Sequence, residues 1–299
     1  MKNIDEILND YPYAAEKLDS LKGTIEAMRL SSEAYLNDPE ALQTMFNSID
    51  LTTLSATDSA ESVKAFVGKV NKFAQDYPTL KNVGGICVYS VFAPVVKSEL
   101  RVQGVHRAVV AACFPSSQAF TDIKVAEVRK AVEAGATEVD VVISVGEFLC
   151  RNYQFVYEEL VAIREACADA RLKVILETGA LQTHEQIWEA SVIAMEAGAD
   201  FIKTSTGKNC EGATPEAAIV MCEAIKAYAA KTGRKVGFKP AGGVSTPAEA
   251  AIYYEIVKSI LGQEWLVNTL FRIGASRLAN SLLAKILKAK GKEAPEKYF

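Results

Sequence analysis

Eight short runs of apolar and β-branched residues recur along the chain from residue 49 onward, separated by stretches with helical spacing of apolar residues. The runs are IDLTTL (49–54), GICVYSV (85–91), AVVAACF (108–114), EVDVVIS (138–144), LKVILET (172–178), DFIKTST (200–206), KVGFKPA (235–241) and LFRIGAS (270–276). Apolar strands that alternate with helices are typical of parallel strands covered by helices. Eight such units in about 230 residues predict an α/β chain folded as a (β/α)8 TIM barrel.

The alternative arrangement of such units is an open, doubly wound sheet. Its signature is a GxGxxG motif directly after the first strand. The segment that follows IDLTTL reads SATDSAESV and contains no glycine. The first strand therefore favours the barrel over the open sheet.

Three parts of the chain differ in pattern. Residues 1–45 contain no strand pattern, and their apolar residues recur at helical spacing, which predicts an N-terminal helical extension. Residues 46–290 hold the eight units and are predicted to form the barrel domain. Residues 291–299 (GKEAPEKYF) are charged and are expected to form a flexible C-terminal tail.

The composition excludes several classes of partner. The chain has 299 residues, a net charge of -4 and a pI near 5.5, so it has no electrostatic bias toward nucleic acid or membrane surfaces. It has no apolar run near 18 residues, and its N-terminus lacks the apolar region of a signal peptide. These features predict a cytoplasmic protein.

The sequence offers few cysteine and histidine residues in patterns that could bind a metal ion. The six cysteines include no CxxC pair, and their spacing fits no zinc pattern, which is typical of a reduced cytosolic chain. Only two histidines, His106 and His184, are present, and neither is assigned a role. We therefore expect no metal site and no Ser-His-Asp triad.

Ionisable residues near the ends of predicted strands are candidates for catalysis, because barrel active sites lie at the C-terminal ends of strands. Asp140, Lys203 and Lys239 fall in EVDVVIS, DFIKTST and GFKPAGG, and Lys173 lies nearer the start of LKVILET. Taken singly, each has an ordinary explanation: a surface lysine, a turn, a salt-bridge partner. Two lysines one strand apart, with a carboxylate two strands earlier, favour a buried site instead.

A lysine pair has a specific chemical use. An ordinary lysine has a pKa of about 10.4, so roughly one amine in 2,500 is neutral at pH 7. A second ammonium about 5 Å away, at an effective dielectric of about 20, disfavours the charged form by roughly 3 kcal/mol. Partial desolvation adds to this effect. The pair therefore predicts a nucleophilic lysine that forms a Schiff base, with Asp140 as a proton relay through water.

Glycines follow the sixth, seventh and eighth predicted strands, two of these loops leading into helices. Backbone amides in such loops bind anions, and the loops after strands seven and eight are the usual phosphate position in this fold. The alternative is that the glycines only make tight turns. The three loops together, beside Arg277, predict a phosphate site formed by Gly207, Lys208, Gly242, Gly243, Gly274 and Ser276.

The chain resembles the deoxyribose-phosphate aldolase family over about residues 48 to 285. The motifs that carry the resemblance are IDLTTL, ICVY, GATEVDVVIS, LKVILETGAL, AGADFIKTSTGK, ATPEAA, VGFKPAGGV and FRIGAS. The resemblance implies a class I aldolase that reversibly cleaves 2-deoxy-D-ribose 5-phosphate to acetaldehyde and D-glyceraldehyde 3-phosphate. It implies small-molecule phosphosugar and aldehyde substrates, no metal or organic cofactor, no nucleic-acid or membrane partner, and a homodimer or other homo-oligomer.

The resemblance also implies residue roles. Lys203 matches the imine-forming lysine, Lys239 the second lysine that perturbs it, and Asp140 the aspartate of the proton relay. The glycine loops match the phosphate-binding positions. The matching polar positions that line the pocket or hydrogen-bond within it are Cys87, Asp50, Thr52, Lys173 and Thr204.

Four positions depart from the family pattern. Ser245 stands where some members have arginine, and Arg277 stands where those members have serine, which suggests that the two exchanges compensate. Ser90 replaces a proline common after ICVY. Tyr298 is one residue short of the chain end, whereas some members end in a tyrosine that reaches the active site.

Two other functions remain open at this level. One is a lysine-Schiff-base barrel with a different donor or acceptor. The other is a catalytically silent phosphosugar-binding barrel, which would be expected to lack at least one of Asp140, Lys203 and Lys239.

Overall fold

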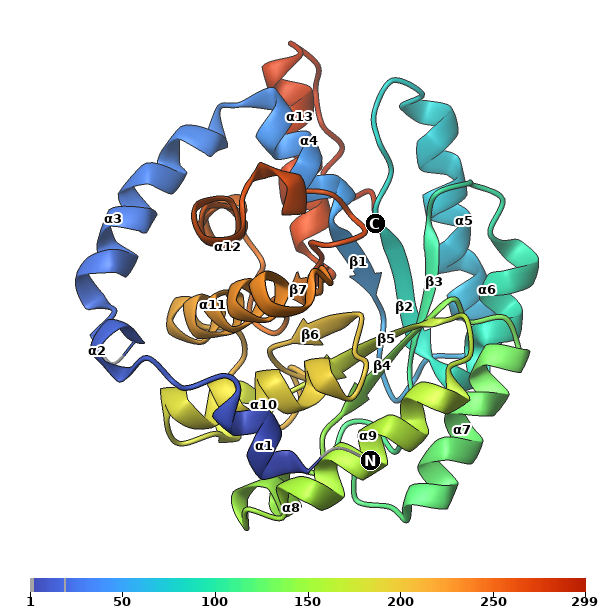
Figure 1. Ribbon diagram of the computed structural model, residues 1–299. Coiled ribbons are helices and arrows are strands. Elements are labelled where there is room, and N and C mark those ends of the chain that lie inside the picture. The colour runs from blue at the N-terminus through green and yellow to red at the C-terminus, as the bar shows by residue number, and fades with distance from the viewer. Residues whose placement is uncertain (1–2, 19) are drawn as a thin grey trace.

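The computed structural model describes residues 3–18 and 20–299, and its main body is a ring of parallel strands enclosed by helices (Figure 1). Hydrogen bonds join the strands in the order β7-β6-β5-β4-β3-β2-β1-β8. The ring closes where Arg272 N donates to Phe238 O at 3.1 Å and Gly274 N donates to Pro240 O at 2.9 Å. The strands are β1 (Ile49–Thr52), β2 (Gly85–Tyr89), β3 (His106–Val110), β4 (Glu138–Val142), β5 (Arg171–Ile175), β6 (Phe201–Lys203), β7 (Gly237–Lys239) and β8 (Ile273–Ala275). The predicted (β/α)8 barrel is confirmed.

Each strand is followed by a helix on the outside of the ring. These helices are α5 (Ala60–Asp76), α6 (Ala93–Glu99), α7 (Thr121–Glu133), α9 (Tyr153–Ala166), α10 (His184–Glu196), α11 (Pro215–Thr232), α12 (Pro247–Leu261) and α13 (Leu278–Ala289). Shorter elements are α8 (Val145–Leu149) and the 3₁₀ turns η2 (Ser90–Phe92), η3 (Thr178–Ala180) and η4 (Gln263–Trp265). Helix α11 starts at Pro215, and its C-cap is Gly233 in the left-handed conformation.

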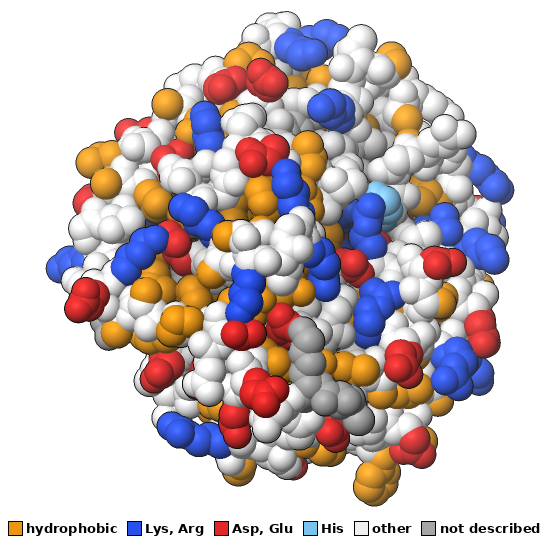
Figure 2. Space-filling view, viewed as in Figure 1, with side chains coloured by type: hydrophobic (Ala, Val, Ile, Leu, Met, Phe, Trp, Pro, Cys, Tyr) orange, Lys and Arg blue, Asp and Glu red, His pale blue; other side chains and the backbone are white. Residues whose placement is uncertain are grey.

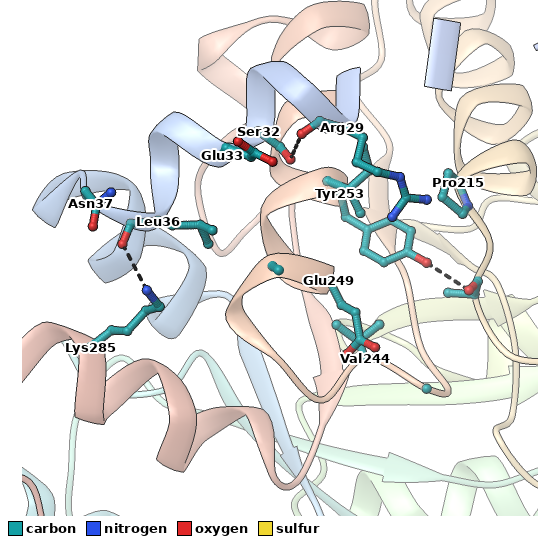
Figure 3. Close-up of a pocket in the computed structure, with 14 residues that line it drawn as sticks. Arg29, Ser32, Glu33, Leu36, Asn37, Pro215, Val244, Glu249, Tyr253 and Lys285 are labelled. Carbon is teal, nitrogen blue, oxygen red and sulfur yellow. Dashed lines mark hydrogen bonds between the residues drawn. The ribbon is translucent and has the colours of Figure 1, made fainter. Parts of the chain in front are cut away.

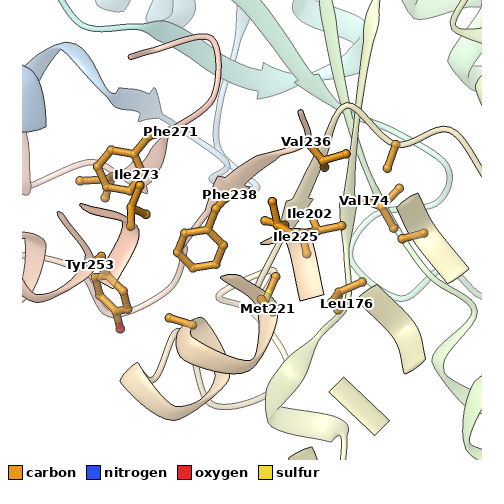
Figure 4. Close-up of a cluster of buried hydrophobic side chains, with 14 of the residues drawn as sticks. Val174, Leu176, Ile202, Met221, Ile225, Val236, Phe238, Tyr253, Phe271 and Ile273 are labelled. Carbon is orange, nitrogen blue, oxygen red and sulfur yellow. The ribbon is translucent and has the colours of Figure 1, made fainter. Parts of the chain in front are cut away.

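Successive side chains of a strand point to opposite faces of the sheet, so one set packs in the core and the other set points into the ring. Figure 4 shows Ile202 and Phe238 among the apolar side chains packed between the ring and its helices, and both are fully buried. Their neighbours Lys203 and Lys239 therefore point to the opposite face of the sheet, into the ring.

A helical extension on the N-terminal side of the barrel wraps the outside of α9 to α12 (Figure 1). It comprises α1 (Ile4–Asn9), α2 (Ala15–Leu18), α3 (Lys22–Ser32), η1 (Glu33–Leu36) and α4 (Pro39–Asn47). Trp188 Nε1 donates to Tyr11 O at 2.8 Å, and Tyr35 OH donates to Glu255 Oε2 at 2.6 Å. The predicted boundary at residue 45 falls inside α4, which leads directly into β1.

The chain end is anchored, although the sequence predicts a flexible tail over residues 291–299. Residues 291–297 are exposed, but Phe299 is buried against the rings of Phe46 and Phe73. The Oδ1 atom of Asn280 accepts from Tyr298 N at 2.8 Å and from Phe299 N at 2.9 Å. Burial of an aromatic ring fixes the last two residues.

The surface carries both charge signs. Figure 2 shows Lys and Arg side chains interspersed with Asp and Glu over the face in view. Within residues 3–18 and 20–299, no helix combines the length and apolarity needed to cross a bilayer.

Candidate active site

Seven ionisable side chains, carried on or next to six strands, meet inside the ring. They are Asp50 on β1, Glu138 and Asp140 on β4, Lys173 on β5, Lys203 on β6, Lys239 on β7 and Arg272 just before β8. All seven are buried. We call this set the ion network.

Lys203 and Lys239 share one carboxylate oxygen. Lys203 Nζ lies 2.8 Å from Asp140 Oδ2, and Lys239 Nζ lies 2.7 Å from the same atom. The two amino groups are therefore no more than about 5.5 Å apart. The two lysines are also register partners on adjacent strands. The predicted association of Asp140, Lys203 and Lys239 is present in the structure.

The remaining charges extend the network toward the base of the barrel. Lys239 Nζ also lies 2.5 Å from Asp50 Oδ2. Lys173 Nζ contacts Glu138 Oε2 at 2.6 Å, Asp140 Oδ1 at 3.1 Å and Asp50 Oδ2 at 3.2 Å. The Arg272 guanidinium bonds Asp50 Oδ1 and lies 2.9 Å from Glu138 Oε1.

The surroundings make the two lysines unequal. Burial lowers the pKa of Lys203, and the charge of Lys239 lowers it further against the attraction of Asp140. Burial also disfavours charge on Lys239, but Asp140 and Asp50 outweigh burial and raise its pKa. Burial alone would raise the pKa of Asp140, yet the ammonium groups of Lys173, Lys203 and Lys239 hold it well below its usual range. Lys203 is therefore the lysine that is prone to be neutral, while Lys239 and Asp140 stay charged.

Counting charges leads to the same assignment. The ion network holds three carboxylates and four basic groups, so full ionisation would leave one uncompensated positive charge in a buried site. An unpaired buried charge is costly, and the group concerned shifts its pKa and neutralises instead. A neutral Lys203 leaves three carboxylates opposite three cations. The sequence points mainly to the neighbouring ammonium as the cause of a lowered Lys203 pKa, whereas in the structure burial is the larger cause.

A cavity of about 540 Å³ opens above Lys203. All six predicted phosphate residues line it, together with Lys203, Thr52 and Arg277. Gly242 has φ of 83°, and a Cβ there would lie 2.9 Å from Gly212 Cα, so no other residue fits without moving a loop. The predicted phosphate residues after β6 and β7 and at the end of β8, where Gly274 lies within the strand, are thus brought together at one cavity.

A larger cavity, of about 660 Å³, lies between the extension and α12 (Figure 3). It shares only Gly243 and Val244 with the first cavity, and neither Lys203 nor any other member of the ion network lines it. Glu249, in its lining, already accepts from Ser245 N and Thr246 N at the start of α12. The smaller cavity is therefore the candidate active site.

Glu177 holds the loop after β6, where the sequence predicts phosphate binding, and Glu177 itself is absent from the residues predicted from the sequence. It is buried, has φ of 55°, and accepts from Thr206 N at 3.0 Å and Thr206 Oγ1 at 2.6 Å. Thr206 Oγ1 in turn accepts from Lys208 N at 3.1 Å. A carboxylate in the apolar run LKVILET is the signal that was available.

The predicted substrate residues occupy different depths. Thr52 lines the cavity, but Asp50 and Lys173 lie beneath it within the ion network. Cys87 is buried, and burial raises the pKa of its thiol. Thr204 Oγ1 donates to Ala241 O and accepts from Ala241 N, so its hydroxyl joins β6 to β7 and does not line the cavity.

Tyr298 lies outside the cavity lining. Its hydroxyl donates to Asp76 Oδ2 at 2.7 Å on α5, and its ring packs against Phe73. We expect Tyr298→Phe to leave kcat within about twofold and to lower stability by about 1 kcal/mol, the usual contribution of one hydrogen bond. Steady-state kinetics and thermal unfolding test this, and a loss of kcat above about tenfold would place Tyr298 in the reaction.

A family model described as DeoC/LacD family aldolase matches residues 44–264. The putative deoxyribose-phosphate aldolase of Caenorhabditis elegans is 43% identical over 250 residues, which cover 83% of this chain and 82% of the relative. The deoxyribose-phosphate aldolase of Homo sapiens is 41% identical over 248 residues, covering 80% of this chain and 78% of the relative.

Among solved structures, the tetrameric deoxyribose phosphate aldolase of Aeropyrum pernix superposes with a TM-score of 0.65 at 27% identity. The match covers 85% of this chain and 95% of that one. The sequence match, the fold and the buried lysines at the cavity floor agree. The chain belongs to the DeoC/LacD family of aldolases.

Proposed function

We propose that this protein is a class I aldolase that reversibly cleaves 2-deoxy-D-ribose 5-phosphate to acetaldehyde and D-glyceraldehyde 3-phosphate. The observation that carries the proposal is the buried Lys203 amine, which faces the cavity and shares Asp140 with a charged Lys239. The names of the relatives from Caenorhabditis elegans and Homo sapiens support the substrate.

In the cleavage direction, the neutral Lys203 amine attacks the C1 aldehyde of the open-chain sugar, and loss of water gives a protonated imine. The imine draws electrons from the C2–C3 bond as the C3 hydroxyl loses its proton. The C2–C3 bond then breaks, releasing glyceraldehyde 3-phosphate and leaving an enamine on Lys203. Protonation of C2 and hydrolysis release acetaldehyde and restore the amine.

Asp140 and Lys239 support these steps from below. Asp140 remains ionised because cations surround it, so it can accept and return a proton through a water. Lys239 remains charged and disfavours a proton on Lys203. The phosphate lies against the amides of the glycine loops and the cations Lys208 and Arg277.

Turnover of 2-deoxyribose 5-phosphate, measured by reduction of the released products in a coupled assay, tests the proposal. We expect activity in the wild type and none in Lys203→Ala. A lysine-Schiff-base barrel that acts on another substrate would form an imine on Lys203 that borohydride traps, without turning over this substrate. A catalytically silent barrel would show neither the trapped imine nor turnover.

Arg277 is proposed to bind the phosphate in place of the arginine that some family members have at position 245. Here the Ser245 hydroxyl bonds Glu249 Oε2, whereas Arg277 lines the cavity. We expect Arg277→Ser to raise KM for the phosphorylated sugar about tenfold, as expected for loss of one charge-assisted hydrogen bond. KM for unphosphorylated deoxyribose should stay nearly unchanged.

The control for this prediction is Arg129→Ser, which removes an arginine from the surface of α7 away from the cavity. It should change neither KM. An equal rise of KM for both sugars in Arg277→Ser would exclude a phosphate role.

Self-association as a homodimer or other homo-oligomer is part of the proposal, and it is supported by the tetramer described for the Aeropyrum pernix relative. Val91, Phe120 and Ile123, which are exposed near α6 and α7, are the surface we expect to be covered. Light scattering of the purified protein tests this, and a monomer at micromolar concentration would contradict it.

The proposed compartment is the cytoplasm, which fractionation tests.

A further inference from the structure

Glu138 and Arg272 belong to the ion network, but neither lines the cavity. Resting on the function proposed above, we infer that they are positioning residues that set the charge balance beneath Lys203 and so keep its amine neutral. Neither residue touches the reacting atoms. Their effect reaches Lys203 through Lys173, Asp50 and Asp140.

Glu138 collects the positive charges at the base of the barrel. It lies two residues before Asp140 on β4, on the same face of the strand. Its oxygens lie 2.6 Å from Lys173 Nζ and 2.9 Å from the Arg272 guanidinium. Arg171, which is partly exposed, and the ring of His106 complete its surroundings at 3.1 and 3.5 Å. Burial lowers the pKa of His106, so this ring adds no charge at pH 7.

The side chain of Arg272 is held in place by burial and by hydrogen bonds to its neighbours. It is fully buried, its Nε donates to Asn268 O, and its guanidinium joins Asp50 to Glu138. A Cβ at Gly85 would lie 3.0 Å from Arg272 Nη1 and 2.6 Å from Asp50 Oδ1. Gly85 on β2, the strand next to β1, therefore leaves space for the Arg272 side chain because it has no side chain of its own.

The bond lengths show how these two residues divide the charges. Lys173 is closer to Glu138, at 2.6 Å, than to Asp140, at 3.1 Å. Glu138 therefore weakens the ion pair between Lys173 and Asp140. Arg272 binds Asp50 Oδ1 and leaves Oδ2 to Lys239 and, at a longer distance, to Lys173. Removing either residue changes how strongly Asp140 can hold a proton on Lys203.

The two removals act in opposite directions. Without Glu138, the network loses a negative charge, and Lys173 interacts more strongly with Asp140. Asp140 then stabilises an ammonium on Lys203 less, which favours the neutral amine. Without Arg272, the network loses a positive charge, and Glu138 and Asp50 draw Lys173 and Lys239 away from Asp140. Asp140 is then free to stabilise an ammonium on Lys203. The charged or titratable groups that face Lys203 are Asp140, Lys239 and Cys87.

The experiment measures the rate of imine formation with acetaldehyde against pH, by rapid quenching with borohydride and mass spectrometry. The rate rises with pH up to an inflection at which Lys203 loses its proton. We expect Glu138→Gln to move the inflection about one unit lower and Arg272→Met about one unit higher. On the steep part of the curve, each unit is about a tenfold change in rate.

Three further variants separate charge from structural damage. Arg272→Lys keeps the charge and should keep the inflection near the wild-type pH, even if it packs poorly. The double variant Glu138→Gln/Arg272→Met restores the balance and should return the inflection toward wild type. Glu159→Gln alters another buried carboxylate, paired with Lys124 at 2.9 Å outside the ion network, and should not move the inflection.

Shifts in the same direction for both single variants, or no shift, would overturn the inference. Should Arg272→Met fail to fold, Glu138→Gln and Arg272→Lys still decide the matter by their inflections. Failure of the proposed function has a different appearance, because the wild type itself would then either carry no label on Lys203 or fail to turn over 2-deoxyribose 5-phosphate.

Discussion

Lys203→Met is expected to lose imine formation and to lower kcat by at least about 10⁴-fold, the scale of removing a covalent nucleophile. Its melting temperature should stay within a few degrees of the wild type, roughly the effect of 1 kcal/mol. The reason is the charge balance of the ion network: a neutral Lys203 adds no charge, so an uncharged side chain of similar length leaves three carboxylates opposite three cations.

Lys173→Met is the matched control. Lys173 contacts Glu138, Asp140 and Asp50, and these carboxylates raise its pKa, so it is charged in the folded protein. Removing it should cost about 3–5 kcal/mol, as for other buried ion pairs. Thermal or urea unfolding compares the two variants. Equal destabilisation would mean that Lys203 is a charged partner in the resting protein.

Lys239→Leu is expected to slow imine formation at pH 7 on the order of 10²-fold and to recover at higher pH. Lys239 is the neighbouring cation, and its loss leaves Asp140 Oδ2 to Lys203 alone. The pKa of Lys203 therefore rises, by about two units for an ammonium about 5 Å away at an effective dielectric of about 20. Since only the neutral amine reacts, the rate is lost below the new pKa and regained above it.

The pH profile of imine formation tests this prediction, with Lys239→Arg as the control that keeps a cation beside Asp140. Lys239→Arg should keep the inflection near the wild-type pH. A Lys239→Leu variant that reacts at pH 7 as fast as the wild type would refute the electrostatic role. A uniform loss of rate at every pH would show misplaced geometry rather than a shifted proton.

The alternation of apolar runs is sufficient to predict the barrel, because each of the eight runs overlaps one strand of the ring. Strands β3 and β5 begin one or two residues before their runs, at the polar residues His106 and Arg171. The strands β6, β7 and β8 are shorter than their runs, with three residues each. After Lys203 the chain leaves the strand at Thr204, whose hydroxyl bonds the backbone of Ala241. The docking of the extension depends on contacts such as Trp188 to Tyr11, which are distant in sequence and leave no local pattern.

Charged residues in apolar runs predicted the centre of the site. Asp140, Lys203 and Lys239 lie where the strand ends meet, as expected for a barrel. Glu138 in EVDVVIS and Arg272 in LFRIGAS carry the same signal, but without coordinates neither has a visible partner. The difference in pKa between Lys203 and Lys239 depends on burial and on the carboxylate oxygens that each amine contacts. Neither can be inferred from the spacing of residues in the sequence.

Borohydride trapping with acetaldehyde, followed by peptide mass spectrometry over a range of pH, tests most directly whether Lys203 is the neutral amine. The account predicts one labelled residue, Lys203, with labelling that sets in well below the pKa of about 10.4 of an ordinary lysine. Label on Lys239 or Lys173, or labelling of Lys203 that begins only near pH 10, would contradict it.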